Sequence, residues 1–446
     1  EVFRSPTVRA LARCIEEAEG REFTAIEPVE TGEYYPLSPA QKRMFLVQQL
    51  VPGSIAYNIS DVLILEGELN LNLETLEEIF RQSIHRHESF RTSIEIIAGE
   101  PAQRVHDAVE FEIEYFLATE ATESTERGNY KLQNTNYKQI PNSKSQITNQ
   151  EVSFGQYLDA CGEEKPPTLA RDTNTIIKSF IRPFELKKAP LLRVGLLRLP
   201  APGSHTPAHS LLLLDMHHII SDGTSYGIIL KEIQRSIAGE TLPPISLQYK
   251  DYCRWQHSEK RKETLKKQEA YWLDSLKGDI PPLDLPVDFP RPAVKGIAAG
   301  GLYFEFDGEE SKGLKELAIK ENCTLFILML ALFYVLLYKI TGREDIIVST
   351  CSAGRRNPGL NGLVGMFVNT LPLRNRPAGE KTFTAFLKEV GQDTLNAYEN
   401  QDYPYDMLEE KIGQTTDKRR NPLAEVNFVI QNLAIAEADM DALQSL

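Results

Sequence analysis

The sequence predicts a mixed α/β protein made of two halves that each combine strands with helices. The mostly apolar run Leu211–Met216 is typical of a buried strand, and Ile229, Ile233 and Ile237 follow it at the spacing of one helix face. A second set of strand and helix patterns follows the proline-rich connector Pro281–Pro292, which marks a seam between the halves.

Length and composition are those of a globular chain with room for two or more domains. The chain has 446 residues, of which 41% are hydrophobic and 25% charged. The formal net charge is −14 and the sequence pI about 5.2, and the basic face that nucleic-acid binding usually needs is not evident in the sequence. The short basic run Lys260–Lys262 is followed by Glu263 and indicates a solvated helix face. We therefore expect no nucleic-acid partner.

The cysteines indicate reduced thiols. The 5 cysteines are odd in number and far apart, without a CxxC pair, which disfavours a disulfide framework and a structural zinc site.

The most apolar run, Leu325–Tyr338, is shorter than the roughly 20 residues that a membrane-spanning helix needs, so it predicts a helix buried on all sides. No signal peptide is visible. We expect a cytoplasmic location and no membrane partner.

The first half opens with a helix over Ser5–Ala18, where Pro6 suits a helix start. One such helix cannot bury its apolar face alone, so we interpret it as the remnant of an upstream domain. A polar, acidic linker follows over Gly20–Glu33. The next expected elements are a strand, a helix and a strand, over Ala56–Leu65, Leu76–His85 and Phe111–Phe116.

Residues 118–172 differ in amino-acid composition from the rest of the first half. They are rich in Asn, Gln, Thr, Ser and Glu and poor in core-forming residues. A structureless loop of this length is uncommon in a compact domain, so the stretch predicts an excursion from the fold. A sequence pattern typical of folded segments resumes at Ile176.

The later elements repeat the mixture of strands and helices. The helix that begins after Gly223 is closed by Gly239, a common helix terminator. The further expected helices are Ser258–Lys277, Glu310–Lys320 and the apolar run, and the further expected strands are Gly301–Phe306 and Asp345–Thr350.

Two adjacent histidines, His217 and His218, end the buried strand and are followed by Asp222 and Gly223. Neighbours on a strand point to opposite faces, so one histidine can face a cleft while the other packs inward. A histidine can move protons near neutral pH, and a nearby carboxylate can order the backbone or pair with an arginine. The segment favours an active site, although a single histidine at a strand end is more often structural.

Other common chemistries lack their motifs. Adjacent histidines cannot easily chelate one ion from a strand, and His205 and His209 lie in a loop rich in proline and glycine, so no metal site is expected. A serine-hydrolase activity is not expected, and the chain has no GxxxxGK phosphate-binding loop.

The segment MHHIISDGTS, at residues 216–225, resembles the active-site motif of condensation domains of non-ribosomal peptide synthetases. Six further segments resemble motifs of that family, in the family's order. They are Ser38–Phe45 (SxAQxR), Arg86–Thr92 (RHExLRT), Tyr249–Gln256 (YxDFAxWQ), Val364–Leu371 (IGxFVNT), Asn400–Tyr405 (HQDYPFE) and Arg420–Leu423 (SRNPLF). One match alone would be weak, but seven in order, from about residue 33 onward, are specific.

The resemblance implies two lobes, each like chloramphenicol acetyltransferase, that form a V-shaped pseudodimer with the active site in a tunnel between them. The N-terminal lobe would cover residues 33–262 and carry the polar insertion. The C-terminal lobe would cover residues 263–446 and be truncated at its end, since the family continues further. The first helix resembles the last helix of a carrier protein, so residues 1–18 would be a carrier remnant and 19–32 a linker.

The resemblance also implies roles for the residues of the active-site segment. His218 matches the catalytic histidine, which would accept the proton of the attacking α-amine or orient that amine and stabilise the tetrahedral intermediate. Asp222 matches a structural aspartate expected to pair with an arginine, for which Arg91 is the candidate. Gly223 would let the substrate approach the backbone, and His217 would pack rather than act.

Two residues of the later motifs, Asn369 and Gln401, are expected to be hydrogen-bonding groups of the tunnel or the lobe interface. The stretches LSPAQKRMF and SIAYNI resemble the subtype whose donor ends in an L-residue. Heterocyclising relatives carry aspartates in place of the histidines, which argues against that activity.

The implied function is acyl transfer, in which the amine of an acceptor aminoacyl-carrier attacks the thioester of a donor carrier and forms a peptide bond. The implied partners are an upstream donor and a downstream acceptor peptidyl carrier protein and an adjacent adenylation domain. The chain itself would bind no cofactor, because the phosphopantetheine arms arrive on the carriers. An epimerisation-type enzyme, an acyltransferase that uses free coenzyme A, and a non-catalytic carrier-docking module stay open as alternatives.

Overall fold

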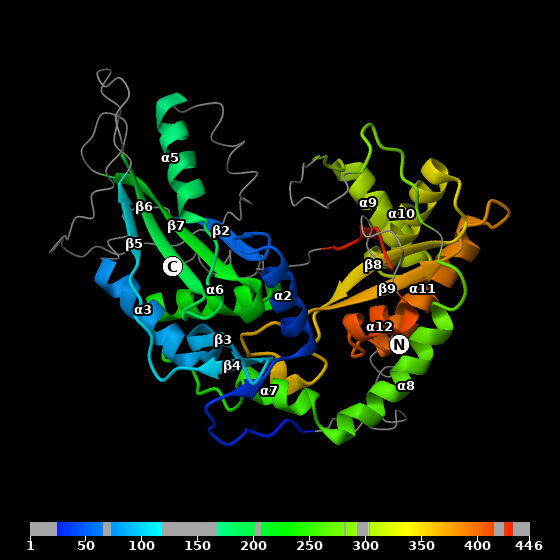
Figure 1. Ribbon diagram of the computed structural model, residues 1–446. Helices are drawn as coiled ribbons and strands as arrows, with labels where there is room; N and C mark the ends of the chain where they lie inside the picture. The colour runs from blue at the N-terminus through cyan, green and yellow to red at the C-terminus, as the bar shows by residue number, and fades with distance from the viewer. Residues whose placement is uncertain are drawn as a thin grey trace, which may run out of the picture. The chain divides into compact units, whose positions relative to one another are not determined.

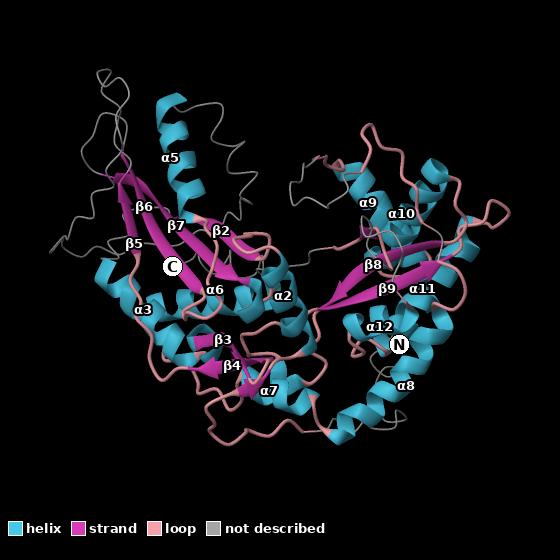
Figure 2. Ribbon diagram, viewed as in Figure 1, coloured by secondary structure: helices cyan, strands magenta, loops and turns pink. Residues whose placement is uncertain are grey.

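The chain forms two compact units with sheets and helices in each, which confirms the predicted mixed α/β class (Figure 2). The computed structural model describes residues 25–65, 73–117, 167–200, 207–280, 282–291, 302, 304–413 and 423–430. The N-terminal unit comprises Ile26–Gln256 with Pro358–Phe367, and the C-terminal unit comprises His257–Asn357 with Val368–Asn432. The expected first helix and residues 118–166 of the predicted insertion lie outside the described residues.

A four-stranded sheet, in the order β2-β7-β6-β5, is the centre of the N-terminal unit (Figure 1). Its strands are β2 (Asn58–Leu65), β5 (Glu114–Leu117), β6 (Leu192–Pro200) and β7 (Pro207–His217). Strand β7 pairs antiparallel with β2 and β6 on its two sides, and Asn58 lies opposite His217. The strand predicted over Leu211–Met216 is confirmed, because all six residues are buried in the middle of this sheet.

Helices and a smaller sheet complete this unit. The smaller sheet has the order β1-β4-β3, with β1 (Tyr35–Pro36), β3 (Thr92–Ile97) and β4 (Glu100–Val105). The helices are α2 (Pro39–Leu50), α3 (Leu73–Arg86), α5 (Pro167–Phe180), α6 (Gly223–Ile237) and α7 (Tyr249–Gln256), with 3-10 turns η1 (Glu88–Arg91), η2 (His218–Ile220) and η3 (Pro358–Leu360). Helices α3 and α6 contact each other (Figure 1).

The C-terminal unit places its helices around a three-stranded sheet, in the order β10-β8-β9 (Figure 1). The strands are β8 (Ile346–Ser352), β9 (Asn369–Asn375) and β10 (Val426–Asn427). The helices are α8 (Glu259–Ser275), α9 (Gly308–Lys320), α10 (Leu325–Thr341), α11 (Phe383–Glu399) and α12 (Tyr405–Ile412).

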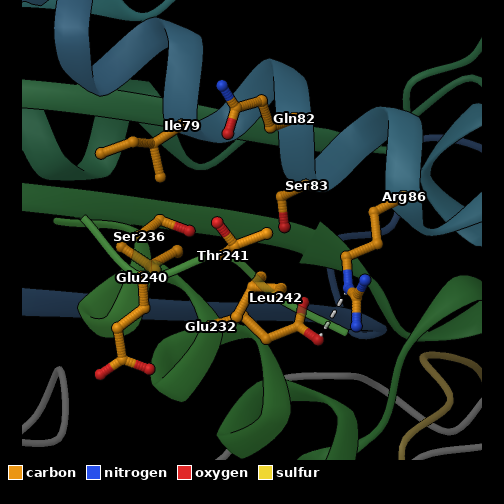
Figure 3. A pocket seen from close by; sticks show the side chains of 10 residues that line it. Ile79, Gln82, Ser83, Arg86, Glu232, Ser236, Glu240, Thr241 and Leu242 are labelled. Carbon is orange, nitrogen blue, oxygen red and sulfur yellow. Dashed lines mark hydrogen bonds and ion pairs between the residues drawn. The ribbon is translucent and has the colours of Figure 1, made fainter. Parts of the chain in front are cut away.

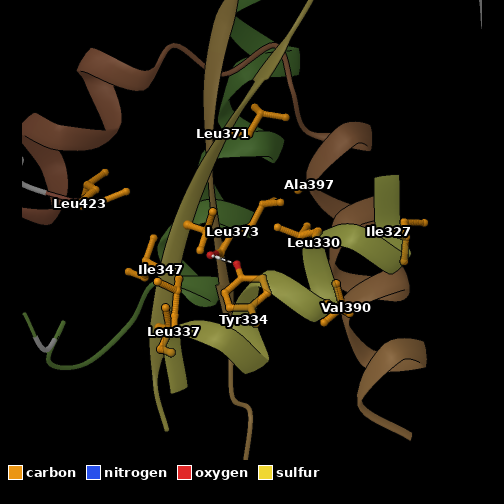
Figure 4. Close-up of a cluster of buried hydrophobic side chains, with 14 of the residues drawn as sticks. Ile327, Leu330, Tyr334, Leu337, Ile347, Leu371, Leu373, Val390, Ala397 and Leu423 are labelled. Atoms are coloured by element: carbon orange, nitrogen blue, oxygen red, sulfur yellow. Dashed lines mark hydrogen bonds between the residues drawn. The ribbon is translucent and has the colours of Figure 1, made fainter. Parts of the chain in front are cut away.

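Helix α10 is the centre of the second core (Figure 4). The hydroxyl of Thr324 accepts the Ile327 N–H at its start, and Gly342, in the left-handed conformation, ends it. The ring of Tyr334 is fully buried and its hydroxyl donates to the Leu373 carbonyl of β9 at 2.7 Å. The prediction that this helix is buried on all sides is wrong, however, since Leu336 is 51% exposed. The helix buries the face toward its sheet and α11 and leaves the opposite stripe exposed.

The apolar character of α10 bears on membrane insertion. No single helix among the described residues has the length and apolarity to cross a membrane. Helices α9 and α10 meet those criteria only as a pair bent by 105°.

Three further predictions differ from the structure. The strand predicted over Gly301–Phe306 is wrong for the described residues of that range, 302 and 304–306, which pair with no described strand, and Phe304 and Phe306 are exposed. The strand predicted from Phe111 begins at Glu114. Helix α5 begins at Pro167, so the last residues of the predicted insertion are helical.

Candidate active site

His217 ends β7 with its imidazole fully buried, packed near the rings of Tyr57 and Phe184 at centroid distances of 6.3 and 6.2 Å. Burial, and then the electrostatic interaction with neighbouring His218, lower the pKa of His217 to about 4. Its Nδ1 accepts the Ile219 N–H at 3.0 Å, so the neutral ring carries its proton on Nε2. This histidine packs inward, as the alternation of strand side chains predicts.

His218 is half-buried and begins the turn η2. Its Nδ1 lies 2.8 Å from the Ser221 carbonyl oxygen. A carbonyl oxygen can only accept, so Nδ1 carries the proton and Nε2 of the neutral ring is left as an acceptor. The His218 backbone N–H donates to the Tyr57 carbonyl at 2.7 Å and ties the turn to the start of β2. In their neutral forms the adjacent histidines therefore hold opposite tautomers, and Nε2 of neutral His218 is suited to taking up a proton.

Asp222 is fully buried and caps the N-terminus of α6. Its Oδ1 accepts the backbone N–H and the hydroxyl of Ser225, each at 2.7 Å, and its Oδ2 accepts the Phe367 N–H at 3.0 Å. A carboxylate at a helix N-terminus is stabilised by the helix dipole and by these donors. The residue orders the backbone that follows His218.

The prediction that Arg91 pairs with Asp222 is wrong. The Arg91 guanidinium donates to the backbone carbonyls of Ile84 and His85, at 3.2 and 3.3 Å, and also to the carbonyl of His106. The first two carbonyls belong to the last turn of α3, where acceptors are unsatisfied and a positive charge is favoured. Arg91 thus supports the end of α3 rather than the carboxylate.

Gly223 is the first residue of α6, and a Cβ built there would meet nothing within 4 Å. Open space beside the backbone is what the predicted approach of a substrate needs. The approach itself stays a prediction.

The segment Pro358–Phe367 lies in the second half of the sequence but packs within the N-terminal unit. Ser225 Oγ lies 2.9 Å from the Gly365 carbonyl oxygen and 3.0 Å from the Gly365 nitrogen. The Ser89 hydroxyl donates to the Val364 carbonyl at 2.7 Å. The Tyr249 hydroxyl donates to the Met366 carbonyl. These contacts hold the segment against Asp222.

The first motif reaches the same turn. Ser38 and Gln41 form a capping box at the start of α2. The Gln41 side-chain amide donates to the Ile219 carbonyl of η2 at 3.1 Å, and Ser38 Oγ lies 2.9 Å from the Tyr249 hydroxyl. Contacts from five of the seven motif segments thus converge on the His218–Asp222 turn or on the segment beside it. Sequence reasoning missed the roles of Gln41, Ser89 and Ser225, although each lies inside a segment that it had singled out.

Replacing Gly365 with alanine is expected to displace this segment. A Cβ at Gly365 would lie 2.0 Å from Cδ2 of Tyr249, whose ring is only 3% exposed. Overpacking of this kind costs about 1–3 kcal/mol or more. Thermal unfolding measures the loss. Gly362→Ala is the matched control, because a Cβ there meets nothing within 4 Å and surface changes usually stay within about 0.5 kcal/mol. Equal melting temperatures for the two variants would contradict the packing.

The buried His217 predicts a pH dependence of stability. Its folded-state pKa of about 4 lies below the ordinary histidine pKa of 6.5, so protonation favours the unfolded chain. Its contribution is complete above pH 6.5 and is lost as pH falls toward 4, by roughly 3 kcal/mol in total. Urea midpoints measured between pH 4 and 8 should show this loss in the wild type. His217→Asn keeps an acceptor for Ile219 but does not titrate, and its profile should be flatter. Parallel profiles would contradict the assignment.

Asn369 and Gln401 lie together in the C-terminal unit. The Asn369 amide donates to the carbonyls of Gln401 and Tyr403, at 2.9 and 2.7 Å, and its oxygen accepts the Tyr405 N–H at 3.2 Å. Gln401 Nε2 donates to the Tyr398 carbonyl at 2.7 Å. These bonds brace the turn between α11 and α12. A role in a tunnel or interface stays a prediction.

A cavity of about 300 Å³, which neither His217 nor His218 lines, lies between α3 and α6 (Figure 3). It is bordered by the ion pair of Arg86 and Glu232, at 3.0 Å, and Glu232 also lies 2.7 Å from His87. These contacts fasten α6 to the end of α3. Within the part of the chain that the structure describes, no group of three His, Cys, Asp or Glu side chains could hold a metal, and Cys253, Cys323 and Cys351 form no disulfide.

Most of the chain, including the turn that carries His218, matches the model of a known protein family. The family model for the condensation domain matches residues 31–147 and 161–445. The chain belongs to the condensation-domain family, which confirms the resemblance found in the sequence. It is a condensation domain of the type found in non-ribosomal peptide synthetases.

Two similar proteins are Tyrocidine synthase 3 of Brevibacillus parabrevis, 40% identical over 442 residues, and Gramicidin S synthase 2 of Aneurinibacillus migulanus, 40% identical over 432 residues. The matches cover 99% and 97% of this chain but only 6% and 8% of those proteins. This chain therefore corresponds to a small part of each relative.

Solved structures share the fold. The X-domain in complex with OxyB from teicoplanin biosynthesis superposes with a TM-score of 0.70 at 21% identity, covering 92% of this chain and 79% of that one. The four-domain nonribosomal peptide synthetase holo-AB3403, bound to AMP and glycine, gives 0.70 at 21% identity, covering 93% of this chain and 28% of that one. The likeness supports the expected fold of two lobes similar to chloramphenicol acetyltransferase.

Proposed function

We propose that this chain joins two carrier-bound aminoacyl units through a peptide bond, with His218 as the catalytic residue. The observation that carries the proposal is the 2.8 Å contact between His218 Nδ1 and the Ser221 carbonyl oxygen, which in the neutral ring leaves Nε2 as an acceptor in a half-buried position. In the proposed reaction the acceptor amine attacks the donor thioester carbon, the C–N bond forms and the C–S bond breaks. The amine loses one proton to Nε2, and Nε2 passes that proton to the departing thiolate, which becomes a thiol.

His218 can serve this reaction in two ways. It can accept the amine proton, or it can orient the amine through a hydrogen bond to Nε2 and stabilise the tetrahedral intermediate. A free α-amine, with a pKa near 8, is partly neutral at physiological pH, so both roles are chemically sound. His217 supports neither role, because its ring is fully buried and its Nδ1 is occupied.

The partners follow from this reaction. The donor and acceptor would arrive as thioesters on phosphopantetheine arms of an upstream and a downstream carrier protein, with an adenylation domain adjacent. The arms are substrates here rather than a resident cofactor. The finer assignments belong to the same proposal: an L-residue donor, a carrier remnant over residues 1–18, a structural role for Asp222 and Gly223, and action in the cytoplasm.

Intact-protein mass spectrometry tests the proposal. One carrier is loaded with an L-aminoacyl donor and the other with an aminoacyl acceptor, and the two are mixed with and without the chain. The expected product is a dipeptide on the acceptor carrier that forms only with the chain. The chirality of the donor residue, measured without acceptor, tests the epimerisation alternative. If the chain binds carriers but, over several aminoacyl pairs, neither forms a dipeptide nor inverts the donor residue, the non-catalytic carrier-docking module is the remaining alternative.

A further inference from the structure

Ser225 has more hydrogen-bond contacts than one hydroxyl proton can serve. Its Oγ lies 2.7 Å from Asp222 Oδ1, 2.9 Å from the Gly365 carbonyl oxygen and 3.0 Å from the Gly365 nitrogen. The carboxylate is the stronger acceptor and the shorter contact, so the hydroxyl donates to Asp222. Its lone pair then accepts the Gly365 N–H. The bonds run in one direction, from the backbone of segment 358–367 through Ser225 to the carboxylate, and bonds in such a chain reinforce one another.

The carboxylate at the end of this chain fixes the peptide that holds His218. The Ser221 carbonyl, which accepts the His218 Nδ1–H at 2.8 Å, belongs to the peptide bond between Ser221 and Asp222. Both residues are fully buried. If this peptide turns, the Asp222 side chain turns with it and leaves its donors. The contacts of the carboxylate therefore resist the motion that would remove the acceptor from His218.

We propose that Ser225 is a positioning residue that keeps His218 in its Nδ1–H tautomer. Its hydroxyl does so by linking the backbone of segment 358–367 to the Asp222 carboxylate through hydrogen bonds, a link called the relay below. The proposal rests on the proposed function for its effect on the reaction, but the tautomer itself is independent of that function. Without the relay the Ser221 carbonyl is freer to turn, and the imidazole then samples both tautomers. Only the Nδ1–H tautomer offers Nε2 as an acceptor in the same orientation.

Nitrogen-15 NMR of the full chain, labelled at histidine, tests the tautomer directly. In the wild type, His218 should show a protonated Nδ1 and His217 a protonated Nε2. In Ser225→Ala, the His218 signal should move toward a mixture of tautomers while the His217 signal stays, because the Nδ1 of His217 still accepts the Ile219 N–H. Ser236→Ala, on the same helix, is the matched control and should change neither signal.

Steady-state condensation kinetics give the second readout. Ser225→Ala should lower kcat by roughly 10–100-fold, the effect of a small misplacement of a catalytic group, with KM changed by less than about twofold. Should the alanine variant fail to fold, Ser225→Cys supplies a side chain of similar shape with a weak donor, and the same changes are expected.

A Ser225 variant that keeps a single Nδ1–H tautomer at His218 would overturn the proposal, even if its activity fell, because the serine would then be merely structural. The proposed function fails separately. A wild-type chain that makes no dipeptide but shows the expected tautomers, with the mixture in Ser225→Ala, would refute condensation and leave the positioning role intact.

Discussion

Replacing His218 with alanine is expected to lower the rate of dipeptide formation by about 10²–10⁴-fold, the usual contribution of a positioned acid–base group. The variant removes Nε2, the acceptor that the Ser221 carbonyl holds available by fixing the proton on Nδ1. Single-turnover mass spectrometry with preloaded carriers measures the chemical step without product release. His85→Ala is the matched control, because His85 is an exposed histidine at the end of α3, and its rate should equal that of the wild type.

His218→Gln separates the two roles of the histidine. Glutamine can hydrogen-bond to an amine but cannot take its proton at neutral pH. A rate close to the wild type would assign His218 to orientation, whereas a loss as large as that of alanine would assign it to proton transfer. A wild-type rate for His218→Ala, in a chain that still makes dipeptide, would remove this residue from the active site.

The local part of the active site was predictable because it is encoded in consecutive residues. An apolar run gave a buried strand, alternation put His217 and His218 in different surroundings, and Gly223 began the next helix. The inward packing of His217 was confirmed in this way. The apolarity of α10 likewise predicted a helix in the core.

The long-range part was not predictable from one sequence. The donor to Asp222 Oδ2 is the Phe367 N–H, which is 145 residues away and carries no side-chain signature. The resemblance implies an arginine partner for Asp222, but the partners of the candidate Arg91 are carbonyls that become neighbours only once α3 and η1 have folded. The exposed stripe of α10 depends on how many elements pack around it. Composition can predict that a helix is apolar, but not how many of its faces are covered.

Arg193 is expected to be the side chain whose loss most destabilises the N-terminal unit. Its Nη1 donates to Asp215 Oδ2 at 2.6 Å, and Asp215 is fully buried on β7, two residues before His217. Ser60 also donates to this carboxylate, at 2.9 Å. Burial raises the pKa of Asp215, an effect that these partners oppose. Arg193→Met leaves a buried carboxylate without its cation, which costs about 3–5 kcal/mol.

The destabilisation by Arg193→Met should extend to the turn that carries His217 and His218. The Arg193 guanidinium lies 3.6 Å from the centroid of the Phe184 ring, and Phe184 packs edge-on against His217. Hydrogen exchange of peptides from β6 and β7 measures the free energy of opening in these strands. Arg182→Met is the matched control, since Arg182 pairs with Glu114 at an exposed position and such pairs are worth about 1 kcal/mol or less.

The double variant Arg193→Met with Asp215→Leu separates the ion pair from the packing. Removing both charges should restore much of the lost stability, because the main cost in Arg193→Met is the uncompensated carboxylate. The sign of the pH effect follows from the same cause. Without Arg193 the folded-state pKa of Asp215 rises further above its unfolded value, so the defect of Arg193→Met should shrink as pH falls and the carboxylate is protonated. A defect that is independent of pH and persists in the double variant would mean that the arginine stabilises β6 and β7 by its packing on Phe184 rather than by its charge.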